Sequence, residues 1–186
     1  MLFNLFGSKK KDKEDPTFKD RVYIEYEAKM NACALLAKEQ PDTMFIAWFT
    51  DTAKQFKAFF IEKGLDENRI IEARYIHATQ FQKKTPVFVE HYPVQAKEMN
   101  LVENWNLQNI LVYSSLNEPF FKYFGSDKII GLLKMTGMQN SEAVEHSYVT
   151  ESIIRAQKNI TDKVIVEKSA NSQAEWMERN LEVREP

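Results

Sequence analysis

The sequence has one cysteine, Cys33, among 186 residues. One thiol cannot form an internal disulfide or a cysteine-rich metal site, and such scarcity is typical of a reducing compartment. Cys33 stands among alanines and leucines, so we expect a buried thiol on a helix face and not a nucleophile. Three histidines, His77, His91 and His146, lack the paired spacing of a metal site, and we expect surface or core roles for them.

Long hydrophobic runs are also missing. The longest runs, such as Met44 to Phe49, are far shorter than the roughly twenty apolar residues that cross a bilayer. A secretory signal is not expected either, because the basic cluster near the start follows the apolar residues instead of preceding them. We therefore expect a cytoplasmic protein.

Neither sign of charge dominates the chain. Its 25 basic and 27 acidic residues leave a net charge of -2, which provides no general attraction for nucleic acid. We therefore expect no nucleic-acid partner.

Glycine is scarce, and none of the five glycines belongs to a G-x-x-x-x-G-K-[ST] run, the loop that cradles phosphates in many nucleotide hydrolases. Ser114 and Ser115 lack the G-x-S-x-G surroundings of a nucleophile elbow. These absences favour a binding protein without a cofactor over an enzyme.

The hydrophobic pattern that is present predicts an α/β fold. Met44 to Phe49 is typical of a strand covered on both faces, and a helix is expected from the cap Thr50-Asp51 to Gly64. Further extended segments are expected at Arg21 to Tyr26, Ile70 to Tyr75, Val87 to Tyr92 and Ile110 to Ser114. Strands that alternate with helices predict a mostly parallel sheet flanked by helices.

From Asn117 onwards the pattern predicts an all-helical C-terminal part. Helix starts are indicated at Asn117-Glu118-Pro119, at Ser126-Asp127 and at Ser147. In the last segment the hydrophobic pattern is weaker, and we expect a strand at Val164 to Val166 and a polar helix around Trp176.

Composition divides the chain into an N-terminal tail (residues 1–16), one globular lobe (17–160) and a C-terminal extension (161–186). In the tail, apolar residues precede lysines. This arrangement would suit contact with a partner or with the anionic inner face of a membrane. A solvated tail without a binding role is the alternative. The candidate contact residues are Leu2, Phe3, Leu5, Phe6, Lys9, Lys10 and Lys11.

The segment Phe124 to Lys158 reads FGSDKIIGLLKMTGMQNSEAVEHSYVTESIIRAQK and strongly resembles the preprotein translocase motor ATPase SecA. Weaker similarity to that family's second nucleotide-binding lobe is found in VYIEYEAKMNA from Val22, ARYIHATQF from Ala73 and ILVYSSL from Ile110. The start, MLFNLFGSKKK, also resembles the start of the family. The resemblance implies a RecA-like fold, of the kind found in the second lobe of P-loop nucleotide hydrolases.

The family's catalytic residues have no counterpart here. Its Q-x-x-G-R-x-G-R motif is missing, and arginine is absent from residues 75 to 154. Loss of an arginine finger lowers the rate of phosphoryl transfer by orders of magnitude. The resemblance and these absences suggest a degenerate lobe that binds a protein, either a translocase component or a substrate protein. An exposed patch among the many aromatic residues would mark the binding site.

Two alternatives stay open. In a split motor, another chain would supply the phosphate loop, and Arg69, Arg74 or Arg155 would have to serve the composite site. Kinship with helicase lobes would instead suggest nucleic-acid binding, which the net charge disfavours.

Overall fold

The computed structural model describes residues 17–81 and 84–181, which form an α/β fold. Its sheet has six strands in the order β3-β2-β4-β5-β1-β6. The strands are β1 (Phe18–Tyr23), β2 (Thr43–Ala47), β3 (Ile70–Glu72), β4 (Thr85–Phe88), β5 (Ile110–Ser115) and β6 (Ala143–Val144). Neighbouring strands are parallel except for β6, which runs antiparallel to β1. The predicted mostly parallel sheet is therefore confirmed.

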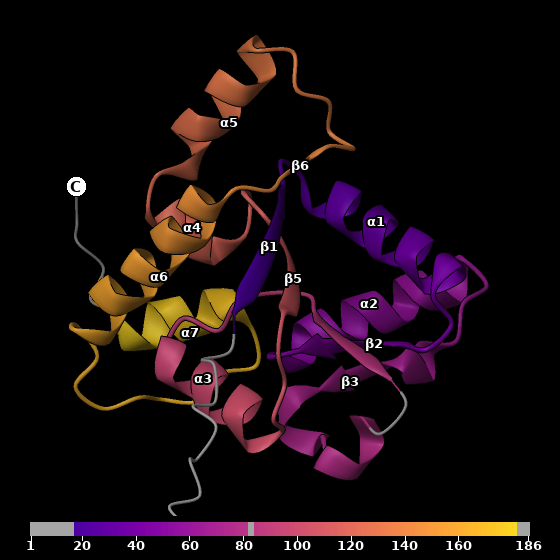
Figure 1. The fold of residues 1–186 in the computed structure, drawn as a ribbon. Coiled ribbons are helices and arrows are strands. Elements are labelled where there is room, and N and C mark those ends of the chain that lie inside the picture. Colours follow the sequence, from indigo (N-terminus) through magenta and orange to yellow (C-terminus); the bar gives the residue numbers. More distant parts are fainter. Residues whose placement is uncertain (1–16, 82–83, 182–186) are drawn as a thin grey trace, which may run out of the picture.

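Helices flank the sheet on both faces (Figure 1). They are α1 (Tyr26–Glu39), α2 (Thr50–Glu62), α3 (Gln95–Asn104), α4 (Pro119–Tyr123), α5 (Ser126–Met135), α6 (Ser147–Thr161) and α7 (Gln173–Asn180). Short 3-10 turns precede and follow β3, at Glu67–Arg69, Ala73–Tyr75 and Ala78–Phe81. Helices α1 and α2 cover one face, and α3, α6 and α7 cover the other.

The core is split into two layers because successive strand side chains point to opposite faces of the sheet. In β2, Phe45 packs with Cys33 and other residues under α1 and α2, whereas Ile46 packs with Val102 of α3 on the far side. Every residue of β2 is buried, as its continuous apolar run predicts. Burial raises the pKa of the Cys33 thiol to about 12, which confirms a core role for this residue.

Three expectations from the sequence need correction. The extended segment expected at Arg21 to Tyr26 is displaced, because β1 spans Phe18–Tyr23, between β5 and β6 in the sheet, and Tyr26 already begins α1. Val164 to Val166 forms no strand, and Ile165 is 98% exposed. The region after Asn117 is not wholly helical, because β6 pairs with the end of β1.

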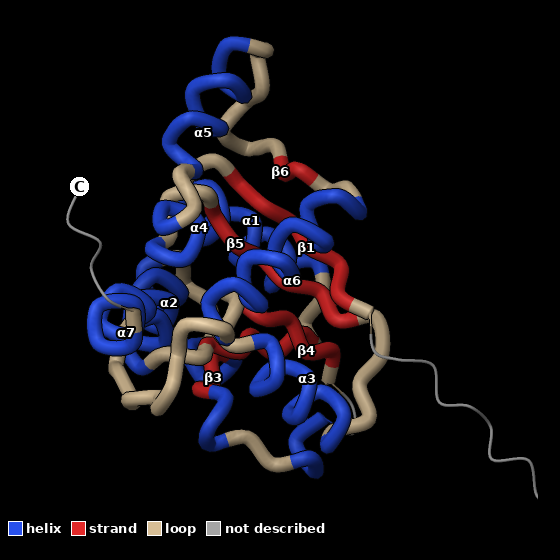
Figure 2. Tube along the Cα trace, turned by 90° about the vertical axis from the view of Figure 1, so that its left-hand side faces the viewer, coloured by secondary structure: helices blue, strands red, loops and turns tan. Residues whose placement is uncertain are grey.

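Helix α5 and the loop that returns to β6, residues 126–142, project from the body of the molecule, and we call this projection the α5 arm (Figures 1 and 2). Gly125 and Gly137 flank the helix with φ values of 78° and 85°, a left-handed conformation that glycine adopts without strain. The base of the arm lies against α4 and near α6, and this junction forms the candidate site described below.

Candidate functional site

An internal ion pair lies at the carboxyl ends of the parallel strands, the edge at which open α/β sheets place their ligands. Lys29 of α1 donates from Nζ to Glu118 Oε1 and to the Val89 carbonyl oxygen, each at 2.7 Å. Glu118 also accepts a hydrogen bond from Ser115 N at 2.8 Å. Both charged side chains are buried. This lysine is already neutralised inside the protein, so it offers no free cation to a phosphate.

Glu90 lies at the amino end of α2, where a helix favours a negative charge. Its carboxylate accepts hydrogen bonds from Trp48 N (2.9 Å), Phe49 N (3.1 Å) and Thr52 Oγ1 (2.8 Å). Burial raises the pKa of Glu90 to about 7, although nearby Lys29 opposes the rise. The side chains of Thr50 and Asp51 do not provide the predicted cap: the N-cap residue is Phe49, whose N–H donates to Glu90, and Asp51 N donates to the Asn171 carbonyl oxygen at 3.0 Å.

His91 belongs to a second buried network. Its Nε2 lies 2.7 Å from Asp20 Oδ1 in β1, and its Nδ1 lies 3.1 Å from Glu98 Oε1 in α3. From α6, Thr150 donates to Asp20 Oδ2 at 2.5 Å and Gln157 donates to Glu98 Oε2 at 2.8 Å. Burial by itself would lower the pKa of His91, but the two carboxylates hold it well above its usual value. The network joins three elements and gives His91 the core role expected of a histidine.

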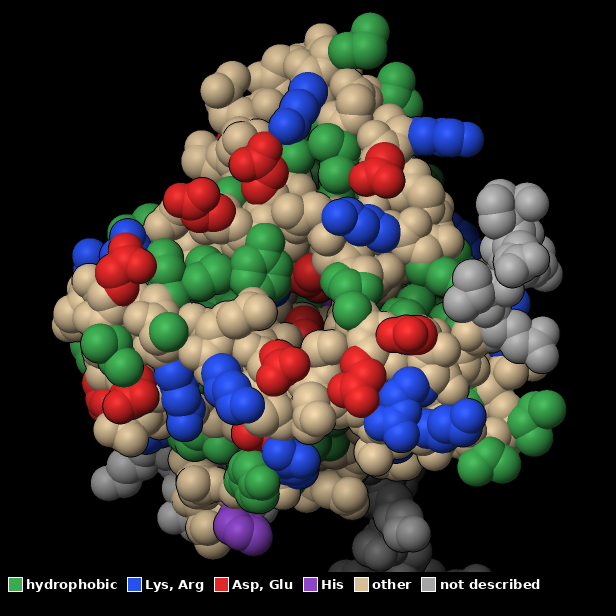
Figure 3. Space-filling model, turned by 180° about the vertical axis from the view of Figure 1, so that it is seen from behind, with side chains coloured by type: hydrophobic (Ala, Val, Ile, Leu, Met, Phe, Trp, Pro, Cys, Tyr) green, Lys and Arg blue, Asp and Glu red, His purple; other side chains and the backbone are tan. Residues whose placement is uncertain are grey.

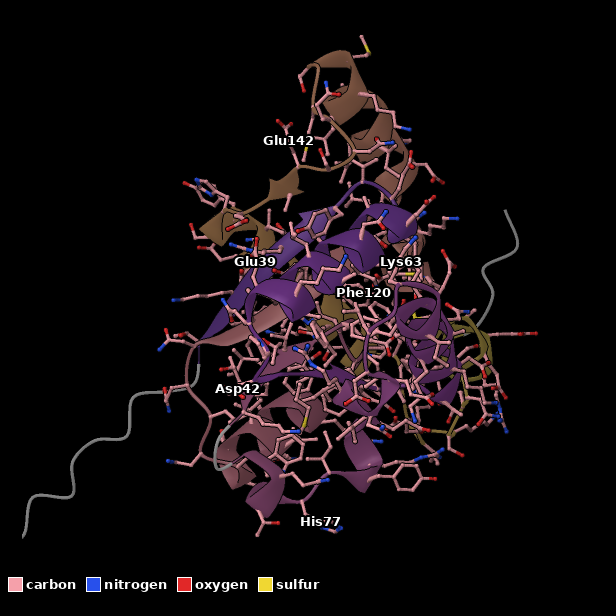
Figure 4. The ribbon with its side chains drawn as sticks, turned by 90° about the vertical axis from the view of Figure 1, so that its right-hand side faces the viewer. Glu39, Asp42, Lys63, His77, Phe120 and Glu142 are labelled. Carbon is pink, nitrogen blue, oxygen red and sulfur yellow. The ribbon has the colours of Figure 1, made fainter. Side chains whose placement is uncertain are left out.

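The other two histidines stand apart from this network. His146 caps α6, since its Nδ1 accepts a hydrogen bond from Tyr148 N at 3.2 Å, so the predicted cap at Ser147 is one residue too late. His77 is exposed and lies at the opposite end of the molecule from Glu142 (Figure 4). Within the part of the chain that the structure describes, no group of three His, Cys, Asp or Glu side chains is placed to hold a metal.

The three arginines considered for a split motor are scattered. Arg69 donates to the carbonyl oxygens of Thr43, Ala37 and Gln40 at 2.9, 2.7 and 2.8 Å, and therefore ties the end of α1 to the start of β2. Arg155 lies on α6 and is exposed. Arg74 alone of the three lies by the carboxyl ends of the strands, where it pairs with Glu72 at 2.8 Å and donates to Thr50 Oγ1 at 2.7 Å.

An apolar groove with a volume of about 340 Å³ lies between α4, α5 and α6, and we call it the α5–α6 groove. Val22 at the end of β1 contributes to its lining. Its walls include Phe121, Phe124, Ile129, Leu133, Val149 and Ile153. No charged side chain lines it among residues 17–81 and 84–181. The groove therefore suits an apolar surface of a partner.

The rim of the groove exposes large hydrophobic side chains. Ile129 and Tyr148 line it with exposed fractions of 47% and 69%, and on the same helix α5 Leu132 and Met135 are exposed by 63% and 85%. Figure 3 shows hydrophobic side chains at the end of the projection and interspersed acidic and basic side chains over the body. Burial of apolar surface is worth about 25 cal/mol per Å², so a partner that covers this region gains stability from it.

A second cleft, of about 510 Å³, lies between α1 and the return loop of the α5 arm. Its lining mixes polar and apolar groups, and two of its charged residues, Arg21 and Glu25, form ion pairs within the chain. Arg21 lies 2.9 Å from Glu145, and Glu25 lies 3.0 Å from Lys134. We consider the α5–α6 groove the stronger candidate for a partner surface, because its described lining residues are mostly apolar and none is charged.

The candidate residues from the sequence and the groove in the structure do not coincide. The predicted contact residues Leu2, Phe3, Leu5, Phe6, Lys9, Lys10 and Lys11 all lie outside the described residues. In the sequence, the groove residues Ile129, Leu133, Val149 and Ile153 belong to apolar stripes at helical spacing. Such a stripe is the same in sequence whether it faces a core or a partner, so only the packing reveals the groove.

One segment of the chain is similar to curated proteins of one kind. No family model matches the chain. It is similar to the protein translocase subunit SecA of Acidithiobacillus ferrooxidans, with 43% identity over 51 residues, which are 27% of this chain and 6% of that protein. The SecA proteins of Anaplasma marginale (42% over 48 residues, 26% and 6%) and Thermus thermophilus (41% over 51 residues, 27% and 5%) are similar to the same degree. The similarity therefore concerns a short segment of SecA.

One further finding concerns membranes. Among the helices of residues 17–81 and 84–181, none is both long and apolar enough to cross a bilayer.

Proposed function

We propose that this chain is a non-catalytic protein-binding module linked to protein translocation, and that it binds its partner in the α5–α6 groove. The observation that carries this proposal is the groove between α4, α5 and α6, whose described lining residues are all uncharged and whose rim leaves Ile129 and Tyr148 largely exposed. The link to translocation is supported by the similarity of a segment of the chain to SecA. The partner would be a translocase component or a substrate protein.

The non-catalytic part of the proposal is supported by the carboxyl ends of the strands. Lys29 is paired with Glu118, and Glu90 fills the amino end of α2. We also propose that the fold is a degenerate relative of the RecA-like second lobe, since five parallel strands carry helices on both faces. Purified protein is expected to show no ATP hydrolysis above background, and turnover that disappears on substitution of one of its own charged residues would contradict this.

Binding of the full-length chain to immobilised SecA and to an unfolded preprotein tests the docking site. Ile129→Asp places a charge in the groove and should weaken binding about tenfold or more, since buried anchors dominate interface energy. Ile61→Asp is the matched control, because Ile61 is 59% exposed on α2, away from the groove. Equal affinities for the two variants, or no binding of the unmodified protein to either probe, would refute the proposal.

The split motor is a second candidate, favoured by one observation. Arg74 lies at the carboxyl ends of the strands, and its side chain is 56% exposed. An arginine finger acts by bringing such a guanidinium to the transferring phosphoryl group. If Arg74→Glu leaves the ATPase rate of SecA unchanged in the presence of this chain, the split motor is excluded.

A further inference from the structure

We propose that the α5–α6 groove binds an amphipathic helix of its partner, one whose apolar stripe is bordered by acidic side chains. This inference rests on the proposed function, because it takes the groove to be the docking site and names the kind of segment that docks there. It is supported by the hydrogen bonds within the lining and by the charges along the two helical edges of the groove.

The lining offers little hydrogen bonding to the backbone of a partner. Ser126 donates its hydroxyl group to the Leu116 carbonyl oxygen. Ser152 donates its hydroxyl group to the Tyr148 carbonyl oxygen at 2.7 Å. Val22 of β1 already pairs with β5 on one side and with β6 on the other, so an added strand finds no free edge there. An extended peptide in this groove would therefore leave many of its N–H and C=O groups unpaired, which is costly away from water.

A helix suits the groove, because it satisfies its own backbone groups. The walls are themselves helices, and an apolar stripe at positions i, i+3, i+4 and i+7 can pack between them. A volume of about 340 Å³ accommodates a few large side chains of such a stripe. Leu132 is 63% exposed and lies one turn from Ile129 on α5, so it extends the apolar surface beyond the rim.

Both helical edges of the groove carry a cation beside their apolar residues. On α5, Lys128 is exposed, directly precedes the lining residue Ile129 and lies one turn from Leu132. Lys128 has no ion pair with any residue that the structure describes. On α6, the side chain of Arg155 is 66% exposed and donates to Ser152 Oγ of the lining at 2.9 Å. An acidic side chain next to the stripe of a bound helix would meet these cations.

The acidic side chains of α5 and α6 do not reverse the charge of these edges. Asp127 lies two residues before Ile129, on the opposite face of α5, where it favours the amino end of the helix. Glu151 lies 3.9 Å from Arg155, but both side chains are more than half exposed, so their attraction is weak. Lys158 is exposed one turn beyond Arg155 and adds a positive charge. The edges therefore favour acidic over basic flanks.

Two other occupants fit the groove less well. In a second copy of the chain, α5 carries Lys128 and Lys134 against Asp127, so it would bring positive charge to positive edges. An anionic membrane is flat on the scale of the groove and would leave much of the lining uncovered. Both occupants are outcomes of the test below.

Two synthetic helical peptides test the inference on the full-length protein. Both carry leucine at positions i, i+3, i+4 and i+7, and the flanking positions hold glutamate in one peptide and lysine in the other. Fluorescence anisotropy at an ionic strength of about 0.01 M should show the glutamate peptide binding about tenfold or more tightly than the lysine peptide. The difference should shrink at about 1 M, because salt screens exposed charges.

Charge reversal at the edges should reverse this preference. Lys128→Glu/Arg155→Glu should bind the lysine peptide more tightly than the glutamate peptide. The control Lys38→Glu/Lys54→Glu makes the same change in net charge on α1 and α2, over the other face of the sheet, and should keep the original preference. Ile129→Asp should weaken the binding of both peptides. The comparison of the two peptides on the unmodified protein needs no substitution, so it decides the question even if a variant is unstable.

Several outcomes would overturn the inference. They are equal affinities of the two peptides at low salt, no binding of either peptide, and binding that Ile129→Asp leaves unchanged. A dimer that dissociates in Ile129→Asp would assign the groove to a second copy of the chain. Binding to vesicles of anionic lipid that is tighter than to either peptide and is lost in Ile129→Asp would assign it to a membrane. Weaker binding of SecA or of the preprotein to Ile129→Asp would still support the proposed function, so the two failures are distinguishable.

Discussion

Lys29 Nζ lies 2.7 Å from Glu118 Oε1, and the two side chains are 0% and 5% exposed. The pair joins the first turn of α1 to the residue that precedes α4. The second carboxylate oxygen, Glu118 Oε2, is buried without a hydrogen-bond partner among the described residues. Glu118 therefore depends on Lys29 for the compensation of its charge.

Removing the lysine should destabilise the protein strongly. Lys29→Met leaves the Glu118 carboxylate buried and unpaired, which costs about 3–5 kcal/mol of unfolding free energy. Urea denaturation at pH 7 measures this. The control is Lys54→Met, which breaks an exposed pair with Asp51 (3.7 Å) and should cost no more than about 1 kcal/mol. Similar losses for the two variants would show that the buried pair is unimportant for stability.

Glu90 should make stability depend on pH between about 4.5 and 7. Burial raises its folded-state pKa to about 7 from an ordinary value of 4.5, so the folded protein resists ionisation of this carboxyl. The unfolding free energy should therefore fall as the pH rises from 4.5 to 7, by an amount on the order of a few kcal/mol.

The variant Glu90→Gln should lose that slope. Its amide oxygen can accept from Trp48 N and Phe49 N, and its amide nitrogen can donate to Thr52 Oγ1, so the cap of α2 is kept. Urea titrations at several pH values provide the measurement, with Glu62→Gln on the exposed end of α2 as the control. An unchanged slope in Glu90→Gln would contradict the assignment.

His91 should titrate above its usual range. Burial opposes its protonation, but Glu98 and Asp20 raise its pKa well above 6.5. Because the folded-state pKa is raised, the stabilisation is complete below about pH 6.5 and is lost as the pH rises through the folded-state value. NMR of the imidazole should show this, and Asp20→Asn should lower the pKa. If Asp20→Asn shifts it no more than the remote control Asp51→Asn, the network does not hold the proton.

The class of the fold could be predicted from the sequence, but the buried charges could not. The apolar run before α2 identified β2, because a strand covered on both faces has no polar positions. The sequence indicates the burial of Lys29 and Asp20 less clearly than it indicates β2. Lys29 lies four residues before Cys33 on the same helix face, and Asp20 shares a strand face with Val22. A charge on an apolar face indicates burial, but its partners come from distant parts of the chain.

The candidate site, like the buried charges, depends on contacts between distant parts of the chain. The start of α2 is held by Glu90 and by the Asn171 carbonyl oxygen, both distant in sequence, whereas local capping rules pointed to Thr50-Asp51. The groove depends on how α5 leaves the body of the protein at Gly125, and a helix stripe does not specify that angle. Short-range patterns therefore gave the elements, whereas the site depends on long-range contacts.

The C-terminal segment should fold as one unit with the sheet. Trp176 of α7 is fully buried in the cluster that contains Phe49, Tyr92 and Phe120. Trp176→Ala should lower the unfolding free energy by about 3–5 kcal/mol in a single transition. Ile165→Ala, which alters a side chain that is 98% exposed, should change it by less than about 0.5 kcal/mol. Two separate transitions, or a silent Trp176→Ala, would show that α7 is not part of the core.

Arg69 and Arg74, at the two ends of the sheet, should contribute unequally to stability. Arg69 donates to three carbonyl oxygens, so Arg69→Met removes charge-assisted hydrogen bonds and should cost about 1.5–3 kcal/mol. Arg74 has an exposed pair with Glu72, and Arg74→Met should cost no more than about 1 kcal/mol. Thermal unfolding of both variants, monitored by circular dichroism, measures the difference in stability. Arg69 stabilises the fold. A change in the ATPase rate of SecA with Arg69→Met would therefore bear on the split motor only if the variant stays folded at the assay temperature. Arg74→Met is therefore the variant suited to test the split-motor proposal, and a large loss of stability in it would show that its contacts also maintain the fold.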